Sequence, residues 1–286
     1  MINYKIFSNN YNNKTGLGKQ TLSLIKQLKL RTKLRRTYEV LSKIIPIENL
    51  QSKNFLSRIN RHLFNLLYFL IGTLSTLLSK DKLISMSVVS PINSHAVHFA
   101  SCHLYALKKV YNNFLLRLIL NPTNIFYVFL EFCHYKNKRS INIFLSEIEK
   151  KQFNEVYGLT KARSVVIRPK LDVKFYNPKK DMYNYGINFL NISHNFKIKG
   201  EHIINDISSS FPQNRFFIVG EKSNKLEKEN IINLGVNDIS RFDFNKYNFF
   251  IYPSKLDSHS FSLEEGFING LIPLSSKNVG FSEIFS

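Results

Sequence analysis

The chain has 286 residues, of which 44% are hydrophobic, and this suffices for two modest domains that each bury a core. Its formal charge of +20 lies in one half, because residues 1–180 hold 30 Lys and Arg against 8 Asp and Glu, whereas residues 181–286 hold 10 against 12. Cys102 and Cys133 are the only cysteines and form no C-x-x-C pair, which argues against a disulfide framework or a zinc module and fits a reducing cytoplasm.

The N-terminal half alternates short apolar runs with helical patterns. Its first residues lack the basic-then-apolar order of a secretory signal and predict a strand at Tyr4–Phe7 instead. A helix is predicted after Gly18, and further strands are predicted at residues 38–41, 83–89, 141–145 and 164–167. This alternation indicates parallel strands joined by helical crossovers.

Residues 62–79 (HLFNLLYFLIGTLSTLLS) form an apolar segment flanked by Arg61 and Lys80. A helix that spans a bilayer needs about 20 residues with little polarity. Four polar residues interrupt this segment, namely Asn65, Thr73, Ser75 and Thr76. We therefore expect a helix that is buried or lies on a membrane surface, with a spanning helix as the alternative.

Two local signals mark the middle of the chain. Ser146 followed by Glu149 is a capping box, which predicts a helix that runs to Gly158. Residues 177–185 (NPKKDMYNY) are polar, contain Pro178 and separate two strand-helix series. We place the domain boundary there, with a basic first domain at residues 1–180 and a second domain at residues 181–286.

The second half contains five apolar runs that predict buried strands. They lie at residues 187–192, Arg215–Val219, 231–234, Phe249–Tyr252 and Ile272–Ser275. Helical or loop segments separate them, so the sequence predicts an α/β protein with two doubly wound, Rossmann-like parallel sheets.

Ligands bind beyond the carboxyl ends of the strands in such a sheet, which directs attention to the residues after each strand. In NISHNFKIKG (residues 191–200), an apolar strand leads into His194, Lys197 and Lys199, and Gly200 opens a helix. Cations and free N–H groups at a helix start suit a diphosphate. A solvated lysine-rich loop is the alternative.

A second candidate site follows the strand at Phe249–Tyr252. Asp257 lies in the loop, and Glu265 lies about one turn inside the next helix, so that both carboxylates can face one crevice. They can accept hydrogen bonds from sugar and ribose hydroxyls, while phosphate can meet the N–H groups of Ser260, Phe261 and Ser262. Acidic residues also favour any helix start, which is the alternative explanation.

A third candidate is the pair Gly16 and Gly18 after the first strand, where a glycine turn would let the backbone approach a ligand. The spacing departs from G-x-G-x-x-G, so it does not by itself indicate a dinucleotide site.

Taken together, these residues resemble glycosyltransferase family 4, whose members have the GT-B fold of two facing Rossmann-like domains. The resemblance covers nearly the whole chain in order: the glycine turn, the linker VVIRPKLDVKFYNP, the donor-domain segments INFLNISHNFKIKG and RFFIVG, and the acidic motif. In the linker, Pro169 and Lys170 stand where the family has Asn-Gly. The match runs to the final residues, where Glu283 is similar to the acid of the family's last motif, whereas members usually continue further, so the resemblance implies a shortened second domain.

The resemblance also implies roles for the candidate residues. Lys199 would bind the pyrophosphate, and His194 stands where the family commonly has a second, arginine ligand. Asp257 would bind hydroxyls of the donor sugar, and Glu265 would bind the ribose, with the Gly and Pro of residues 270–273 matching the family's spacing.

On the acceptor side, the family often places a histidine near the point of sugar transfer. The segment HAVHFASCH offers His95, His98 and His103, of which His103 matches best because an apolar helix follows it. A structural histidine is an equal alternative for each of the three. A Cys/His metal site lacks a second cluster that would complete four ligands.

The implied function is retaining transfer of a sugar from a nucleotide-sugar to a lipid-linked or cell-surface glycan, with no metal and no cofactor beyond the donor. The basic domain would contact anionic lipid at the inner face of the cell membrane or bind a charged glycan. One alternative is a catalytically impaired relative that binds nucleotide-sugar or glycan without transfer. A nucleic-acid-binding protein is favoured by charge alone and not expected, and a compositional bias towards Lys and Asn would also explain the charge.

Overall fold

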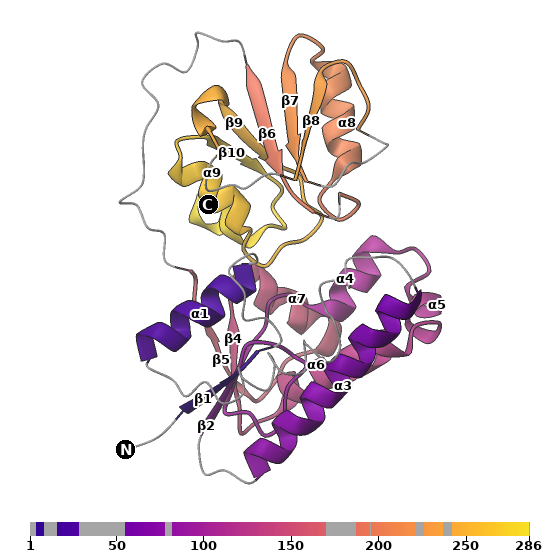
Figure 1. Cartoon of the computed structure of the whole chain (residues 1–286), viewed down its shortest axis with the longest axis vertical. Helices are drawn as coiled ribbons and strands as arrows, with labels where there is room; N and C mark the ends of the chain where they lie inside the picture. Colours follow the sequence, from indigo (N-terminus) through magenta and orange to yellow (C-terminus); the bar gives the residue numbers. More distant parts are fainter. Residues whose placement is uncertain are drawn as a thin grey trace. The chain divides into compact units, whose positions relative to one another are not determined.

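The computed structural model describes residues 4–8, 16–28, 55–77, 82–169, 187–194, 196–220, 226–236 and 242–285 (Figure 1). The chain divides into two compact units, the first formed by Met1–Phe144 with Lys150–Ile167 and the second by Leu145–Glu149 with Arg168–Ser286. The boundary expected at residues 177–185 lies outside the described residues, so the division at residue 180 stays a prediction.

The first unit contains a five-stranded parallel sheet. Its strands, in sheet order, are β1 (Tyr4–Phe7), β2 (Lys82–Ser85), β3 (Ala96–His98), β4 (Ile141–Phe144) and β5 (Arg163–Val166). The strands predicted around residues 4–7, 141–145 and 164–167 are therefore confirmed. The strand predicted at 38–41 lies outside the described residues.

The strand predicted at residues 83–89 is too long, because β2 ends at Ser85. Local turn bonds replace the ladder beyond that point: the N–H of Val89 donates to Ser87 Oγ at 3.2 Å, and the N–H of Ser90 donates to the carbonyl of Val88 at 2.9 Å. The apolar run thus continues past the strand as a turn.

Six helices are described in this part of the chain. They are α1 (Gly16–Leu28), α3 (Phe55–Leu77), α4 (His103–Val110), α5 (Phe114–Ile119), α6 (Pro122–Lys136) and α7 (Glu147–Tyr157). The long apolar helix begins at Phe55 rather than residue 62, and its Phe64 and Tyr68 pack with Phe7 of β1 in a buried cluster. In the described ranges, no helix combines the length and apolarity needed to cross a membrane.

The capping box predicted for α7 is confirmed. The N–H of Glu149 donates to Ser146 Oγ at 3.1 Å, and the carboxylate of Glu149 accepts from the N–H of Leu145 at 2.7 Å. The helix ends before Gly158, which has a φ of +67°. A glycine adopts this left-handed conformation without the steric penalty of other residues.

The second unit contains another five-stranded parallel sheet, and all five predicted strands are confirmed. They are β6 (Asn188–Ile192), β7 (Arg215–Val219), β8 (Ile231–Gly235), β9 (Phe249–Tyr252) and β10 (Ile272–Ser275). The sheet order is β10-β9-β6-β7-β8. The chain builds outward from β6 to β8 and then crosses to β9 on the other side of β6, so the direction of winding reverses between β6 and β9.

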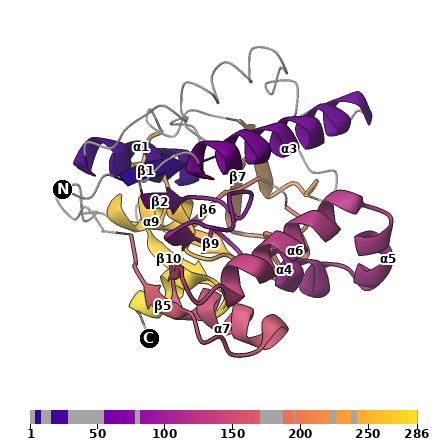
Figure 2. The same ribbon diagram turned by 90° about the horizontal axis from the view of Figure 1, so that it is seen from below.

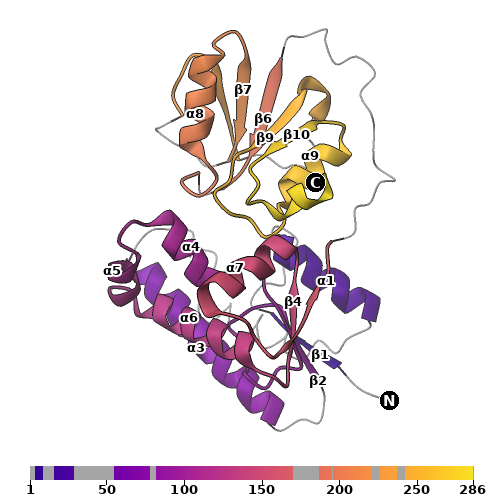
Figure 3. The same ribbon diagram turned by 180° about the vertical axis from the view of Figure 1, so that it is seen from behind.

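Helices cover both faces of this sheet (Figure 3). On one face, Ile204 of α8 (Glu201–Ser210) packs with Phe216 and Ile218 of β7. On the other face, Leu263 of α9 (Phe261–Ile268) packs with Leu190 of β6 among other apolar residues. Neighbouring strand residues point to opposite faces, which is why these strands are apolar at nearly every position.

Candidate functional site

The loops that follow β6 and β9 are joined where the winding of the second sheet reverses. The N–H of Lys255 donates to the carbonyl of Ile198 at 2.8 Å. Gly200 has a φ of +82°, and a Cβ there would lie 2.1 Å from the carbonyl oxygen of Pro253. Both the backbone angle and the close approach require glycine, so Gly200 allows the two loops to meet.

An ion pair links these two loops. Lys199 Nζ lies 2.5 Å from Asp257 Oδ2, and the two side chains are 20% and 17% exposed. The hydroxyl of Tyr252 donates to the same carboxylate oxygen at 2.7 Å, and the N–H of His259 donates to Asp257 Oδ1 at 3.1 Å. The structure therefore brings together two residues that the sequence predicts for one site.

The charges of this pair stabilise each other. Burial raises the pKa of Asp257, but the Lys199 ammonium and the hydrogen bonds from Lys199, Tyr252 and His259 outweigh it and hold that pKa below its ordinary value of 3.8. Burial, followed by the charge of Asp257, raises the pKa of Tyr252 well above 10. At neutral pH the site therefore holds the carboxylate of Asp257 and the neutral phenol of Tyr252 beside Lys199.

The start of α9 adds hydrogen-bond donors beside this pair. Ser260 is the N-cap, and its hydroxyl accepts from the N–H of Leu263 at 3.4 Å. Ser260 and Ser262 also lower the pKa of Tyr252, against the larger effects of burial and of Asp257. Helix geometry leaves the N–H groups of Phe261 and Ser262 without an acceptor inside the helix, so they favour an anion. We call Lys199, Tyr252, Asp257, Ser260 and Ser262 the switch-point site.

Ser260 has a φ of +75° and is the one non-glycine residue with a positive φ within the described ranges. This conformation is unfavourable for a residue with a Cβ, and such strain is concentrated at functional sites. The sequence offers no signal for it, because serine at a helix N-cap ordinarily adopts an extended conformation.

The two adjacent acids of α9 have different surroundings. Glu264 is buried and lies 2.7 Å from His259 Nε2, and the ring of His259 packs against those of Phe261 and Phe281. Sequence reasoning missed the His259–Glu264 contact because no motif marks it. Glu265, the next residue in the chain, is half-buried, and its assignment to the donor ribose stays a prediction.

His194 and Lys197 are exposed in the loop after β6. Unlike Lys199, neither takes part in the hydrogen bonds that define the switch-point site among the described residues. The phosphate role of His194 stays a prediction.

The glycine and histidine candidates of the first unit occupy helix starts. Gly16 and Gly18 lie in the first turn of α1, so the expected glycine turn is part of the helix, and Gly18 is buried. His103 is the first residue of α4, as expected. Its Nε2 lies 3.3 Å from Asn124 Oδ1, its ring packs edge-on against Tyr127, and burial lowers its pKa.

The other two histidines of HAVHFASCH have structural surroundings. His95 Nδ1 accepts from the N–H of Leu83 at 3.3 Å. His98 is buried at the end of β3, and burial lowers its pKa to about 4, so its ring is neutral at physiological pH.

A buried carboxylate caps the helix that begins at His103. Glu131 of α6 accepts from the N–H of His103 at 2.6 Å and from the N–H of Leu104 at 3.3 Å. The hydroxyl of Tyr157 donates to the same carboxylate at 2.6 Å. Burial raises the pKa of Glu131 to about 7, although these hydrogen bonds act to lower it. Sequence reasoning missed this cap, because it comes from a different helix.

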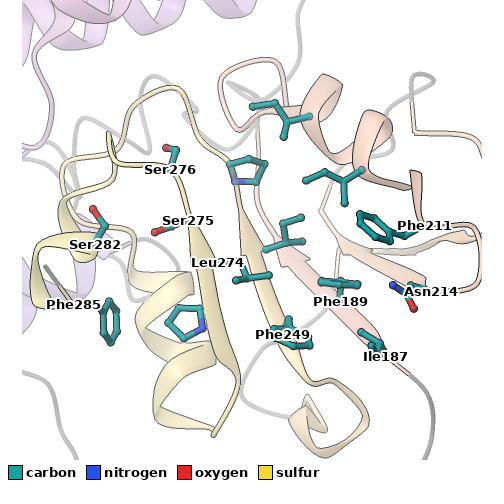
Figure 4. Close-up of a pocket in the computed structure, with 15 residues that line it drawn as sticks. Ile187, Phe189, Phe211, Asn214, Phe249, Leu274, Ser275, Ser276, Ser282 and Phe285 are labelled. Carbon is teal, nitrogen blue, oxygen red and sulfur yellow. The ribbon is translucent and has the colours of Figure 1, made fainter. Parts of the chain in front are cut away.

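A groove of about 870 Å³ lies on the face of the second sheet that also carries α8 (Figure 4). Its lining is apolar or hydroxylated apart from the amide of Asn214, and it includes Ile187, Phe189, Phe211, Phe249, Leu274 and Phe285. It contains no charged side chain, so it offers no counter-charge for a diphosphate. The switch-point site is therefore the better candidate for an anionic ligand.

Two further observations concern metals and the end of the chain. In the ranges described above, no three His, Cys, Asp or Glu side chains gather as metal ligands, and Cys102 and Cys133 form no disulfide there. Within the second unit, the carboxylate of Glu283 accepts from the N–H of Ile148 at 2.5 Å and pairs with Arg168 at 2.8 Å. Glu283 therefore holds the start of α7 in that unit.

No protein-family model matches the sequence, and no curated protein matches it. The fold, in contrast, is similar to that of several solved structures. WaaG, a glycosyltransferase involved in lipopolysaccharide biosynthesis, has a TM-score of 0.66 and 12% identity, with 99% of this chain and 83% of WaaG covered.

Two further structures are similar along almost the whole chain. Anabaena Alr3699/HepE in complex with UDP and glucose has a TM-score of 0.59 and 12% identity, with 98% of this chain and 82% of that one covered. A UDP-forming α,α-trehalose-phosphate synthase from Burkholderia xenovorans has a TM-score of 0.57 and 9% identity, with 99% and 86% covered. The two parallel α/β sheets and these similarities show that the chain has the GT-B fold.

Proposed function

We propose that this chain is a glycosyltransferase that uses a nucleotide-sugar and binds the donor diphosphate at the switch-point site. The observation that carries the proposal is the meeting of the Lys199 ammonium, the Asp257 carboxylate and the start of α9 at the point where the winding of the sheet reverses. The complex of HepE with UDP and glucose supports it, because that protein has the same fold.

The chemistry of the site suits the departure of a nucleoside diphosphate. The Lys199 ammonium has three N–H donors, and the contact with Asp257 uses one of them, so the others can bind phosphate oxygens. The N–H groups of Phe261 and Ser262 add donors to the charge that develops on the leaving group. Asp257 can accept from sugar hydroxyls, and Glu265 can accept from the ribose.

The finer proposal is a family 4 enzyme that retains anomeric configuration without a metal and transfers to a lipid-linked or cell-surface glycan. His103 would act on the acceptor side. His194 would contribute one hydrogen bond where the family commonly has an arginine fork, so we expect phosphate binding to be weaker than in members with that arginine.

Thermal-shift and calorimetric titrations with UDP-, GDP- and ADP-sugars test this proposal. We expect one nucleotide class to raise the melting temperature, and we expect Lys199→Ala to weaken its binding by about tenfold or more. Lys197→Ala, which removes an exposed lysine from the same loop, is the matched control and should bind as the parent does.

Two results would overturn the proposal: no stabilisation of the parent by any of the three classes, or equal binding by the parent and Lys199→Ala. Binding without donor hydrolysis or transfer would instead support the catalytically impaired alternative.

A further inference from the structure

The long helix α3 is apolar on both of its sides. One side is in the core, where Phe64 and Tyr68 are 3% and 0% exposed. The opposite side carries four exposed leucines at helical spacing: Leu63, Leu66, Leu70 and Leu74. A helix of a soluble protein normally turns polar residues to water, so a second apolar stripe indicates a second apolar neighbour.

The stripe on α3 does not stand alone, since α6 carries a similar one. Ile125, Phe129 and Phe132 are exposed at helical spacing on α6. Asn65 Nδ2 donates to the hydroxyl of Tyr127 at 2.6 Å, and Phe69 packs edge-on against Phe126, so α3 and α6 are held together. The two stripes therefore keep a fixed relation to each other.

The short helix α5 extends the same flank of the first unit (Figures 1 and 2). Four aliphatic side chains of α5 and its C-cap point to solvent, namely Leu115, Leu116, Ile119 and, at the C-cap, Leu120. Ile119 and Leu120 are 68% and 71% exposed, well beyond the exposure of a partly packed side chain. We call the exposed apolar residues of α3, α5 and α6 the apolar face.

The charge around the apolar face is positive. Residues 55–140 contain ten Lys and Arg but only two acids, Asp81 and Glu131, and Glu131 is buried. Lys108, Lys109 and Arg117 are exposed on the adjoining helices α4 and α5. The described surface of these helices thus combines aliphatic side chains with cations.

We propose that the apolar face docks the protein on an anionic phospholipid bilayer, with its aliphatic side chains in the interface and its cations on the headgroups. This combination is the one that interfacial helices use. A second copy of the chain would bring the same positive charge to the contact, which disfavours self-association. Nucleic acid favours stacking on aromatic rings or arginine, whereas most of the apolar face is leucine and isoleucine, with Phe129 and Phe132 as its aromatic members.

Flotation of the full chain with phosphatidylcholine vesicles, with and without roughly a third of phosphatidylglycerol, tests this proposal. We expect binding to the anionic vesicles that weakens between about 0.1 M and about 1 M salt, because screening shortens the range of charge attraction. The double variant Ile119→Gln/Leu120→Gln should bind about tenfold more weakly, since it removes apolar burial and keeps helix propensity.

Leu159→Gln/Val236→Gln is the matched control, because these residues are 83% and 70% exposed and lie outside the apolar face. It should float as the parent does. Phe129→Gln on α6 provides an independent second variant, and circular dichroism verifies that each variant is folded.

Three results would overturn the proposal. The first is equal flotation of the parent and both face variants, and the second is equal binding to neutral and anionic vesicles at each salt concentration. The third is a parent that does not float but forms a dimer, detected by light scattering, which the double variant no longer forms. Salt-sensitive RNA binding without flotation would also overturn it. None of these readouts uses donor binding, so this proposal and the proposed function can fail separately.

Discussion

The ammonium of Lys199 and the carboxylate of Asp257 lie 2.5 Å apart although 58 positions separate them in the chain. Lys199 lies in the loop after β6, and Asp257 lies in the loop after β9. These strands are neighbours in the sheet although β7 and β8 come between them in sequence. The order of the strands therefore creates the site, and the following predictions test its parts and the fold around it.

Asp257→Asn should destabilise the second unit in a pH-dependent way. The folded pKa of Asp257 lies below its ordinary value of 3.8, so the ionised carboxylate stabilises the fold above that value. This stabilisation is lost as the pH falls through the folded pKa. Urea unfolding should show the parent to be more stable at neutral pH, with a difference that shrinks below about pH 4. A difference that is the same at pH values above and below this point would contradict the ion pair.

Substitutions of the two adjacent acids of α9 should have different effects, one on turnover and the other on stability. Glu265→Ala should lower donor turnover by about 100-fold and leave the melting temperature nearly unchanged, since its side chain is half-buried and assigned to the ribose. Glu264→Ala should instead destabilise the fold by about 1–3 kcal/mol, because it leaves the buried ring of His259 without its partner. Donor hydrolysis and thermal unfolding of both variants check this, and turnover of Glu265→Ala within tenfold of the parent would rule out its role.

Gly200→Ala should be more destabilising than Gly235→Ala. Both glycines have a positive φ, +82° and +68°, but a Cβ at Gly200 would meet the carbonyl of Pro253, whereas one at Gly235 has nothing within 4 Å. The free energy of unfolding of the control should therefore fall only by the left-handed penalty of about 1 kcal/mol, and that of Gly200→Ala should fall clearly more. Chemical denaturation measures both, and equal losses would show that the contact between the two loops does not matter.

Glu131→Gln should flatten the dependence of stability on pH. Glu131 has a pKa of about 7 in the folded chain, raised from 4.5 chiefly by burial. Between these values the folded chain holds a proton that the unfolded chain has lost, so the free energy of unfolding falls as the pH rises from about 4.5 to about 7. The uncharged glutamine removes this fall, and denaturation at several pH values in that interval compares the slopes. Identical slopes would show that Glu131 does not titrate there.

Much of the secondary structure follows from the sequence alone. Apolar runs predict all five strands of the second sheet, and the capping box predicts the start of α7. The run at 83–89 misleads, because local hydrogen bonds of Ser87 and Val88 end β2 early. A run of apolar residues records burial, and a buried turn produces the same pattern as a buried strand.

The individual candidates of the site were also visible in the sequence, since charged residues and glycines follow the strands at Lys199, Gly200 and Asp257. The tertiary contacts of the site and of the fold around it were not visible in the sequence. The cap of Glu131 on α4, the contact of His259 with Glu264 and the left-handed backbone of Ser260 have no local signature.

What the sequence by itself determined about this protein is the identity and order of its elements, because periodicity and capping depend on residues a few positions apart. Only the tertiary structure decided that Lys199 meets Asp257 and that α3, α5 and α6 each leave apolar residues exposed. These relations depend on which strands become neighbours and which helix faces the core buries, and both are settled by packing between residues that are distant in the chain.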